Sequence, residues 1–276
     1  AGGDAITTMY VDQPLVQYNV AEDCSRQMNP TDYPSGWQRV AAGIWPWKCK
    51  DSVFQYNECY NNQYAYHGNG DGQAWDADWT DGTLYQYNYS HGNSRGAIMF
   101  CGAEAVNTTF RYNISENELT GPLDLPGNPD AHIYNNTFYM NENIKSIFDR
   151  TGGNAVLENN IFYYGGSTPL NQNWYPGGTL QYDNNLYYNF ANTPSGDKNA
   201  VVVNAGTKVL EDAGSGPSSN TSGIAYIKEN ASVFDGYKLA EDSPAINAGK
   251  VITDNNGYDL EHDFFGHALT DIPEIG

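Results

Sequence analysis

Short runs of alternating apolar and polar residues recur along the chain, and each run closes on an asparagine. The clearest run is Pro-Leu-Val-Gln-Tyr-Asn at 14–19, and related phrases follow as far as residue 185. The closing residues are Asn19, Asn57, Asn88, Asn113, Asn136, Asn160 and Asn185. Alternation over so few residues is typical of half-buried strands, and no long stretch has the apolar period of a helix. The pattern predicts an all-β protein.

The spacing of these asparagines indicates a structural repeat. Successive closing residues lie 38, 31, 25, 23, 24 and 25 positions apart, and a period of roughly 20–50 residues is typical of a solenoid. A repeat of about 24 residues with about three short strands fits one coil of a parallel β-helix, whose stacked coils bury a continuous core. We expect the recurrent Asn to adopt a left-handed corner conformation and to form a hydrogen-bonded ladder along the axis. A β-sandwich would explain neither the phrase nor its spacing.

The longest intervals between repeats predict two insertions, at 28–48 and 67–82. In a solenoid, extra residues leave the stacked coils as loops on one face, which is often the binding face. We therefore expect a single β-helix domain over 1–276. Its stacked coils would reach residue 210, and 211–276 would hold the last coils and a closing segment. The chain begins in mid-coil and stops within its ending, so both ends look truncated.

Acidic residues dominate the charged side chains. The 33 Asp and Glu residues against 13 Lys and Arg give a formal net charge of −20. Such a surface repels nucleic acid, whose binding depends on neutralisation of phosphates by basic side chains. It also slows the approach of polyuronates and sulfated polymers. The charge therefore favours a neutral oligosaccharide or glycan as the partner. No apolar run approaches the length of a membrane span.

Cysteines and glycosylation sequons favour an extracellular location, either secreted or at the cell surface. Four cysteines occur in the first 101 residues without a Cys-x-x-Cys pair, which argues against a zinc ribbon. We expect one or two disulfides among Cys24, Cys49, Cys59 and Cys101, with no assignable pairing. Five sequons would carry glycans only if a eukaryote secreted the chain. They begin at Asn88, Asn107, Asn113, Asn220 and Asn230.

The acidic stretch at 67–82 carries the strongest chemical signal. It packs four aspartates, two tryptophans and four glycines into sixteen residues. Like charges so close together raise the pKa of at least one carboxyl group, as an acid/base catalyst requires. On one strand, Asp76 and Asp78 would leave the same face about 6–7 Å apart, and the glycines at 70 and 72 permit a bend that brings Asp71 to Asp78. Either pair suits the two-carboxylate chemistry of glycosidases.

Aromatic and polar residues around this stretch are candidate sugar contacts. Aromatic faces bind the apolar side of a sugar ring, and a water-excluding wall raises the pKa of a nearby acid. The candidate substrate-binding residues are Trp45, Trp47, His67, Gln73, Trp75, Asp76, Trp79 and Glu104. Asp124 is a weaker candidate. Hydrolysis needs no cofactor, although clustered Asp oxygens also suit Ca²⁺. The scattered histidines give no zinc-binding spacing.

Three features of the chain together resemble the β-helix domain of the lacto-N-biosidases of glycoside hydrolase family 136. They are the repeated Tyr-Asn phrase, the Gly-Asp-Gly…Trp-Asp-Ala-Asp-Trp stretch at 70–79 and the Ser-Pro-Ala-Ile-Asn-Ala-Gly ending at 243–249. The resemblance implies a right-handed parallel β-helix and a retaining mechanism that uses two aspartates seven residues apart. Within the acidic stretch only Asp71 and Asp78 have that spacing. The resemblance therefore implies Asp71 as the nucleophile and Asp78 as the acid/base.

The sequence predicts a secreted glycoside hydrolase that acts on a neutral oligosaccharide, releasing a disaccharide from its end by double displacement. Two alternatives stay open. A polysaccharide lyase or epimerase would place calcium on the Asp cluster and abstract a proton with a base, although the net charge argues against it. A non-catalytic, glycan-binding β-helix adhesin would bind without turnover. We also expect a companion domain or subunit that supplies further coils.

Overall fold

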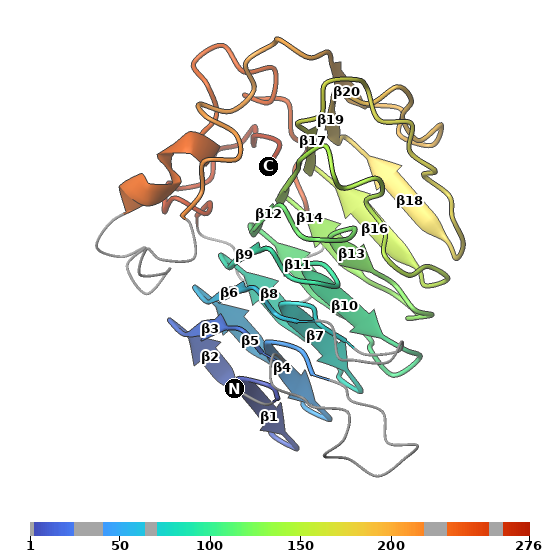
Figure 1. Ribbon diagram of the computed structural model, residues 1–276, viewed down its shortest axis with the longest axis vertical. Coiled ribbons are helices and arrows are strands. Elements are labelled where there is room, and N and C mark those ends of the chain that lie inside the picture. Colours follow the sequence, from blue (N-terminus) through green and yellow to red (C-terminus); the bar gives the residue numbers. More distant parts are fainter. Residues whose placement is uncertain (1–2, 25–40, 64–70, 218–230, 254–261) are drawn as a thin grey trace.

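The computed structural model describes residues 3–24, 41–63, 71–217, 231–253 and 262–276. In these ranges the chain forms three sheets of five, seven and eight strands that extend side by side along one axis (Figure 1). Every strand-to-strand pairing within these sheets is parallel and joins one coil to the next. The predicted parallel β-helix is therefore confirmed.

Each sheet takes one strand from each successive coil that contributes to it. The first sheet contains β1 (Ile6–Met9), β4 (Ile44–Trp47), β7 (Trp75–Asp78), β10 (Ile98–Cys101) and β13 (Leu123–Asp124). The second contains β2 (Leu15–Gln17), β5 (Val53–Gln55), β8 (Leu84–Gln86), β11 (Thr109–Arg111), β14 (His132–Tyr134), β16 (Ala155–Glu158) and β18 (Leu180–Asp183). The third contains β3 (Val20–Glu22), β6 (Glu58–Tyr60), β9 (Tyr89–His91), β12 (Ile114–Glu116), β15 (Thr137–Met140), β17 (Ile161–Tyr164), β19 (Leu186–Tyr188) and β20 (Val201–Val203). A 3₁₀ helix, η3 (Ala231–Tyr237), follows.

The core consists of side chains that stack from coil to coil. Because side chains alternate along a strand, every second residue points inward and meets its counterpart in the next coil. Phe138, Phe162 and Tyr187 show this stacking, with ring centroids 5.5 and 5.7 Å apart. Each is fully buried, and full burial of such a side chain contributes about 1.5–3 kcal/mol. No single coil could bury these rings alone.

The predicted asparagine ladder is present along the whole stack. From Asn19 to Asn160, each ladder asparagine donates its backbone and side-chain N–H groups to Oδ1 of the next, at 2.9–3.2 Å. Asn185 donates in the same way to Asp197. The left-handed conformation falls one residue earlier than predicted, for example on Tyr56 and Tyr87. The ladder asparagine thus supplies hydrogen bonds, while the residue before it makes the turn.

The two insertions are shorter than predicted. Residues 44–47 and 75–78, which were expected in loops, form β4 and β7 and continue the first sheet. The physical reason is alternation, because Ile44 and Trp75 are buried in the core as the inward residues of regular strands. Of the predicted insertions, residues 28–40 and 67–70 lie outside the described residues.

Within the described residues of 211–276, the C-terminal segment contains the 3₁₀ helix η3 and adds no strand to the three sheets. After β20 the chain turns back, and its last part lies beside the second and third sheets (Figure 1). There the Asn135 side chain donates to the carbonyl oxygen of Glu274 at 3.0 Å, and the His262 ring stacks on Tyr87 with centroids 4.6 Å apart. The segment therefore acts as a strap across several coils.

The cysteines and two sequons depart from expectation. All four cysteines carry free thiols, so the expected disulfides are absent. Cys59 accepts a hydrogen bond from the Asn62 side chain at 3.0 Å. Asn88 and Asn113 are ladder residues, 0% and 2% exposed, so their side chains are inaccessible to glycosylation. No helix of the described part is long and apolar enough to cross a membrane.

Candidate active site

The acidic cluster lies on the outer face of the first sheet. In β7, Trp75 and Ala77 are fully buried in the core. Alternation along the strand therefore turns Asp76 and Asp78 to the opposite, outward face. The prediction that these two carboxyl groups leave one face of one strand is confirmed, and neither is sunk in the apolar interior.

Two rows of outward side chains cross the sheet through these aspartates. The strand register places Asp76 beside one outward residue of each neighbouring coil, and it places Asp78 beside another. The first row contains Trp45, Asp76, Met99 and Asp124, and the second contains Met9, Trp47, Asp78 and Cys101. Residues widely separated in sequence therefore surround the carboxyl groups, including the weaker candidate Asp124.

An ion pair between the partly exposed Arg150 and the buried Asp124 lies beside Asp71. Nε of Arg150 donates to both carboxylate oxygens of the fully buried Asp124 at 2.9 Å. Gln73 donates its side-chain amide to Asp124 Oδ2 at 2.6 Å. Nη2 of the same guanidinium lies 3.8 Å from Asp71 Oδ1. Arg150 therefore links a buried structural carboxylate to the predicted nucleophile.

The surroundings of Asp71 set its ionisation close to the physiological range. Burial raises the pKa of this carboxyl group to about 6, with Arg150 opposing the rise, Asp124 and Asp78 adding to it and Arg95 opposing it. A carboxyl group with this pKa is largely ionised at neutral pH and becomes protonated in mild acid. An ionised carboxylate is the form that attacks an anomeric carbon.

The surroundings of Asp78 suit a proton donor. Burial raises the pKa of Asp78, a hydrogen bond from the Cys101 thiol opposes the rise, Glu104 adds to it and Lys48 opposes it. One of its carboxyl oxygens, Oδ1, is buried and has no hydrogen-bond partner among the described residues. A raised pKa together with an unpaired oxygen is the combination that a general acid needs beside a leaving group.

Asp76 is the most deeply buried of the three aspartates on this face. Its pKa is raised well above the usual value, first by burial and then by Asp71 and Asp78. Its Oδ1 atom also lacks a hydrogen-bond partner among the described residues. Asp76 therefore favours the neutral form, in which it can donate a hydrogen bond to a substrate hydroxyl.

The structure sorts the predicted substrate contacts into two groups. The partly buried Trp45 and Trp47 and the exposed Trp79 and Glu104 lie on the outer face or at its edge. Trp75 does not, because it is fully buried and packs its ring against Tyr85 in the core. This placement corrects the prediction of a stacking role for Trp75.

Gln73 and His67 are the remaining candidate substrate contacts. Gln73 is fully buried, and its side chain accepts a hydrogen bond from Gly72 N while it donates to Asp124. It therefore holds Asp124 in place, which corrects the prediction that Gln73 contacts substrate. His67 lies outside the described residues, and its predicted role stays a prediction.

Reasoning from the sequence missed the basic residues of the site, Lys48, Arg95 and Arg150. A signal for one of them existed, because Arg150 follows Asp124 by 26 residues, close to one coil. Alignment of the coils would have placed the two side by side. Among the described residues, no group of three or more His, Cys, Asp or Glu side chains is arranged to hold a metal ion.

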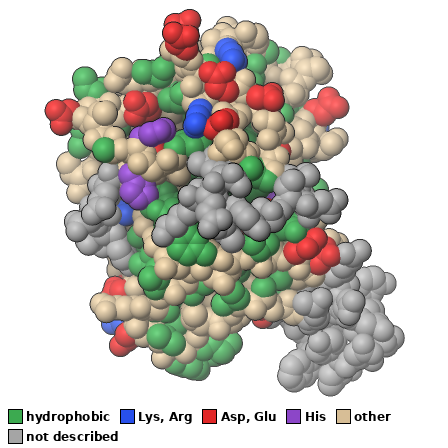
Figure 2. Space-filling model, turned by 90° about the vertical axis from the view of Figure 1, so that its left-hand side faces the viewer, with side chains coloured by type: hydrophobic (Ala, Val, Ile, Leu, Met, Phe, Trp, Pro, Cys, Tyr) green, Lys and Arg blue, Asp and Glu red, His purple; other side chains and the backbone are tan. Residues whose placement is uncertain are grey.

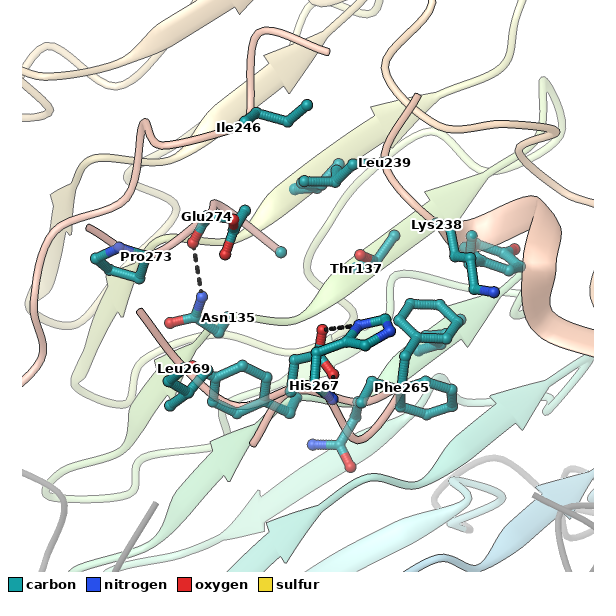
Figure 3. Close-up of a pocket in the computed structure, with 18 residues that line it drawn as sticks. Asn135, Thr137, Lys238, Leu239, Ile246, Phe265, His267, Leu269, Pro273 and Glu274 are labelled. Carbon is teal, nitrogen blue, oxygen red and sulfur yellow. Dashed lines mark hydrogen bonds and ion pairs between the residues drawn. The ribbon is translucent and has the colours of Figure 1, made fainter. Parts of the chain in front are cut away.

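A cavity of about 350 Å³ lies elsewhere, between the C-terminal strap and the corner of the second and third sheets. Figure 3 shows that its walls are largely apolar, including Leu239, Ile246 and Leu269. The carboxyl group of Asp263 is engaged by the backbone and ring of His267. Among the described residues, no carboxyl oxygen that lines this cavity is both buried and without a hydrogen-bond partner, in contrast to those of Asp76 and Asp78.

Fold and site together define a parallel β-helix that carries a cluster of carboxyl groups with raised pKa values on one outer face. Comparison with known proteins shows which proteins this chain is similar to in sequence and structure. The whole chain aligns over 285 residues, at 51% identity, with the lacto-N-biosidase of Bifidobacterium longum subsp. longum. The crystal structure of the glycoside hydrolase family 136 lacto-N-biosidase from Eubacterium ramulus, native and as a selenomethionine derivative, matches 60% of the chain at 44% identity with a TM-score of 0.52. No protein-family model matches the chain.

The chain is therefore a homologue of part of the family 136 lacto-N-biosidases, which confirms the resemblance found in the sequence. It spans 18% of the length of the Bifidobacterium protein and 26% of the Eubacterium chain. These enzymes are glycoside hydrolases by name.

Proposed function

We propose that this chain forms the catalytic region of a retaining glycoside hydrolase, which releases lacto-N-biose from the end of a neutral oligosaccharide. The single observation that carries the proposal is the arrangement of Asp71 and Asp78 on the outer face of the first sheet. There Asp71 lies beside a guanidinium, and Asp78 has a raised pKa and a buried carboxyl oxygen with no hydrogen-bond partner among the described residues. The homology supports the substrate class, because the relative over the whole chain is a lacto-N-biosidase.

In the proposed mechanism the two carboxyl groups divide the chemistry of double displacement. The Asp71 carboxylate attacks the anomeric carbon while Asp78 gives its proton to the departing glycosidic oxygen, so that one C–O bond forms as the other breaks. Water then attacks the same carbon, Asp78 takes a proton from that water, and the bond to Asp71 breaks. The sugar leaves with its original anomeric configuration, and both carboxyl groups return to their starting states.

Substitution of each carboxyl group tests this assignment. Asp71→Asn and Asp78→Asn should each lower kcat for an oligosaccharide ending in lacto-N-biose by about a thousandfold or more. Each amide keeps the shape of the side chain but neither attacks nor transfers a proton. Rates are measured by product release, in the longest polypeptide that carries this sequence, and the thermal unfolding midpoint checks the fold. The exposed Glu241 provides the control Glu241→Gln, which should keep the parent rate. Turnover near the parent rate in either Asp variant would refute the assignment.

The same activity assay separates the remaining proposals. We propose that the hydrolase acts outside the cell. We also propose that it needs no metal ion, so chelation of Ca²⁺ should leave the rate unchanged. Loss of activity with a chelator, together with an unsaturated product, would instead indicate a lyase. Glycan binding without any turnover would indicate an adhesin.

A further inference from the structure

The corner that follows the first sheet carries a stack of side chains. Tyr10, Lys48 and Trp79 occupy the same corner position in three successive coils, and all three have left-handed backbone conformations with φ of 53–56°. The ammonium of Lys48 lies 4.7 Å from the ring centroid of Trp79 and 4.6 Å from that of Trp47. Lys48 therefore covers one face of the Trp79 ring and is held there by cation–π attraction.

The stack stops at the next coil. Because Cys101 pairs with Asp78, the corner residue after Trp79 is Gly102, which has a φ of +74° and no side chain. Among the described residues, a Cβ added at Gly102 would meet only Glu104 Oε2, at 3.9 Å. The Trp79 side chain is 48% exposed. Within the part of the chain that the structure describes, the place of the missing fourth side chain is thus an open slot beside Trp79, with the Glu104 carboxylate at its edge.

This slot lies on the Asp78 side of the proposed catalytic pair. Trp79 directly follows Asp78, and both Lys48 and Glu104 act on the ionisation of Asp78. The charged groups that act most strongly on Asp71 are instead Arg150, Asp124, Asp78 and Arg95. In a glycosidase the acid/base transfers its proton to the leaving group. The slot therefore lies on the leaving-group side of the scissile bond.

We propose that the slot beside Trp79 is the subsite for the leaving-group sugar. A neutral pyranose ring stacks on the free face of Trp79 and donates hydroxyl hydrogens to the Glu104 carboxylate, taking the place that a side chain at Gly102 would fill. Glu104 accepts hydrogen bonds but repels anionic sugars, which restricts the subsite to uncharged rings. The inference rests on the proposed function, because it takes Asp78 as the acid/base.

Two substrates that share one glycosyl group test the subsite. The first is an oligosaccharide in which lacto-N-biose is joined to a further sugar, and the second is lacto-N-biosyl fluoride, which has no leaving-group sugar. Trp79→Ala removes the stacking ring. Gly102→Asn fills the slot, since Asn tolerates a positive φ. Each variant should lower kcat/KM for the oligosaccharide by about tenfold or more and change that for the fluoride by less than about twofold.

Matched variants at the far end of the chain provide the controls. Gly206 has a φ of +100° and nothing within 4 Å of an added Cβ, so Gly206→Asn should leave both rates unchanged. Tyr175, an aromatic residue 48% exposed, provides Tyr175→Ala as the second control. Activity on the fluoride shows that each variant is folded.

The outcomes distinguish this inference from the proposed function. A parent enzyme active on both substrates, whose Trp79→Ala and Gly102→Asn variants lose activity on both alike or on neither, overturns the subsite alone. A parent that hydrolyses neither substrate overturns the proposed function, and the subsite with it.

Discussion

At the scale of single residues, three aspartates on one face differ mainly in their surroundings. Asp71 has a guanidinium 3.8 Å away and Asp78 has a thiol donor, whereas Asp76 is influenced most by its own burial and then by the other two aspartates. Burial raises the pKa of all three, and these neighbours decide how far each one rises. Environments that separate the pKa values of neighbouring acids are how one site obtains both a nucleophile and a proton donor.

Arg150 should control the acid limb of the pH–rate profile. Because burial raises the pKa of Asp71 to about 6, kcat/KM should fall as the pH drops through about 6 and the nucleophile becomes protonated. Arg150→Met removes the positive charge that most strongly opposes this rise. Its acid limb should therefore move to higher pH, as measured by kcat/KM between pH 4 and 8.

The double variant Arg150→Met with Asp124→Asn completes this test. It leaves no buried carboxylate without its counter-ion and also removes an acid that raises the pKa of Asp71. Its acid limb should shift back toward that of the parent. The exposed Lys198 supplies the control Lys198→Met, with an unchanged profile. An acid limb that stays fixed, or moves to lower pH, in the Arg150→Met variant would show that Arg150 does not control the ionisation of Asp71.

At the scale of elements, the asparagine ladder determines how the coils stack. A buried ladder residue joins its own coil to both neighbours, so each rung contributes several hydrogen bonds that water cannot replace. The strap adds contacts across coils that are not adjacent, because Gly276 donates to Asn159 at 2.8 Å while His262 lies against Tyr87. Stability of the stack should therefore depend on the ladder far more than on exposed amides.

Asn113→Ala tests the ladder. The Asn113 side chain accepts hydrogen bonds from Asn88 and donates to backbone and side-chain oxygens that include those of Tyr85 and Asn136. Its loss should lower the free energy of unfolding by about 3–4 kcal/mol, since several buried groups lose their partners. Urea denaturation measures the change. For the exposed Asn199, which makes one side-chain bond to Asp183, Asn199→Ala should cost less than about 0.5 kcal/mol. Equal losses would contradict a special role for the ladder.

The elements also show which features of the fold and site were readable from the sequence. The repeat and its ladder were predictable because one residue type recurs at one interval. Strand β7 was partly hidden within a predicted insertion, although its alternation correctly indicated that Asp76 and Asp78 share a face. The path of the strap was not predictable, since several of its bonds to the coils use backbone groups, such as the carbonyl oxygen of Glu274 and the N–H of Gly276, that leave no mark in the sequence. Arg150 was missed because its contact with Asp71 depends on how irregular coils align.

At the scale of the whole molecule, the net charge of −20 influences which polymers can approach the stack. Acidic side chains are scattered over the end that carries the C-terminal strap, with few basic ones among them (Figure 2). A field of this sign slows the approach of anionic polymers but not of neutral sugars. The chain spans 18% of the length of its Bifidobacterium relative, and the companion domain or subunit expected from the sequence stays a prediction.

Azide rescue tests the central claim most directly. In Asp71→Gly, azide occupies the space of the lost nucleophile and attacks the anomeric carbon of an aryl lacto-N-bioside once. In Asp78→Gly, azide instead displaces Asp71 from the covalent intermediate. Proton NMR of the glycosyl azides should therefore show inverted configuration with Asp71→Gly and retained configuration with Asp78→Gly. The reverse pair of configurations, or hydrolysis at the parent rate in either variant without azide, would contradict the assignment of the two aspartates.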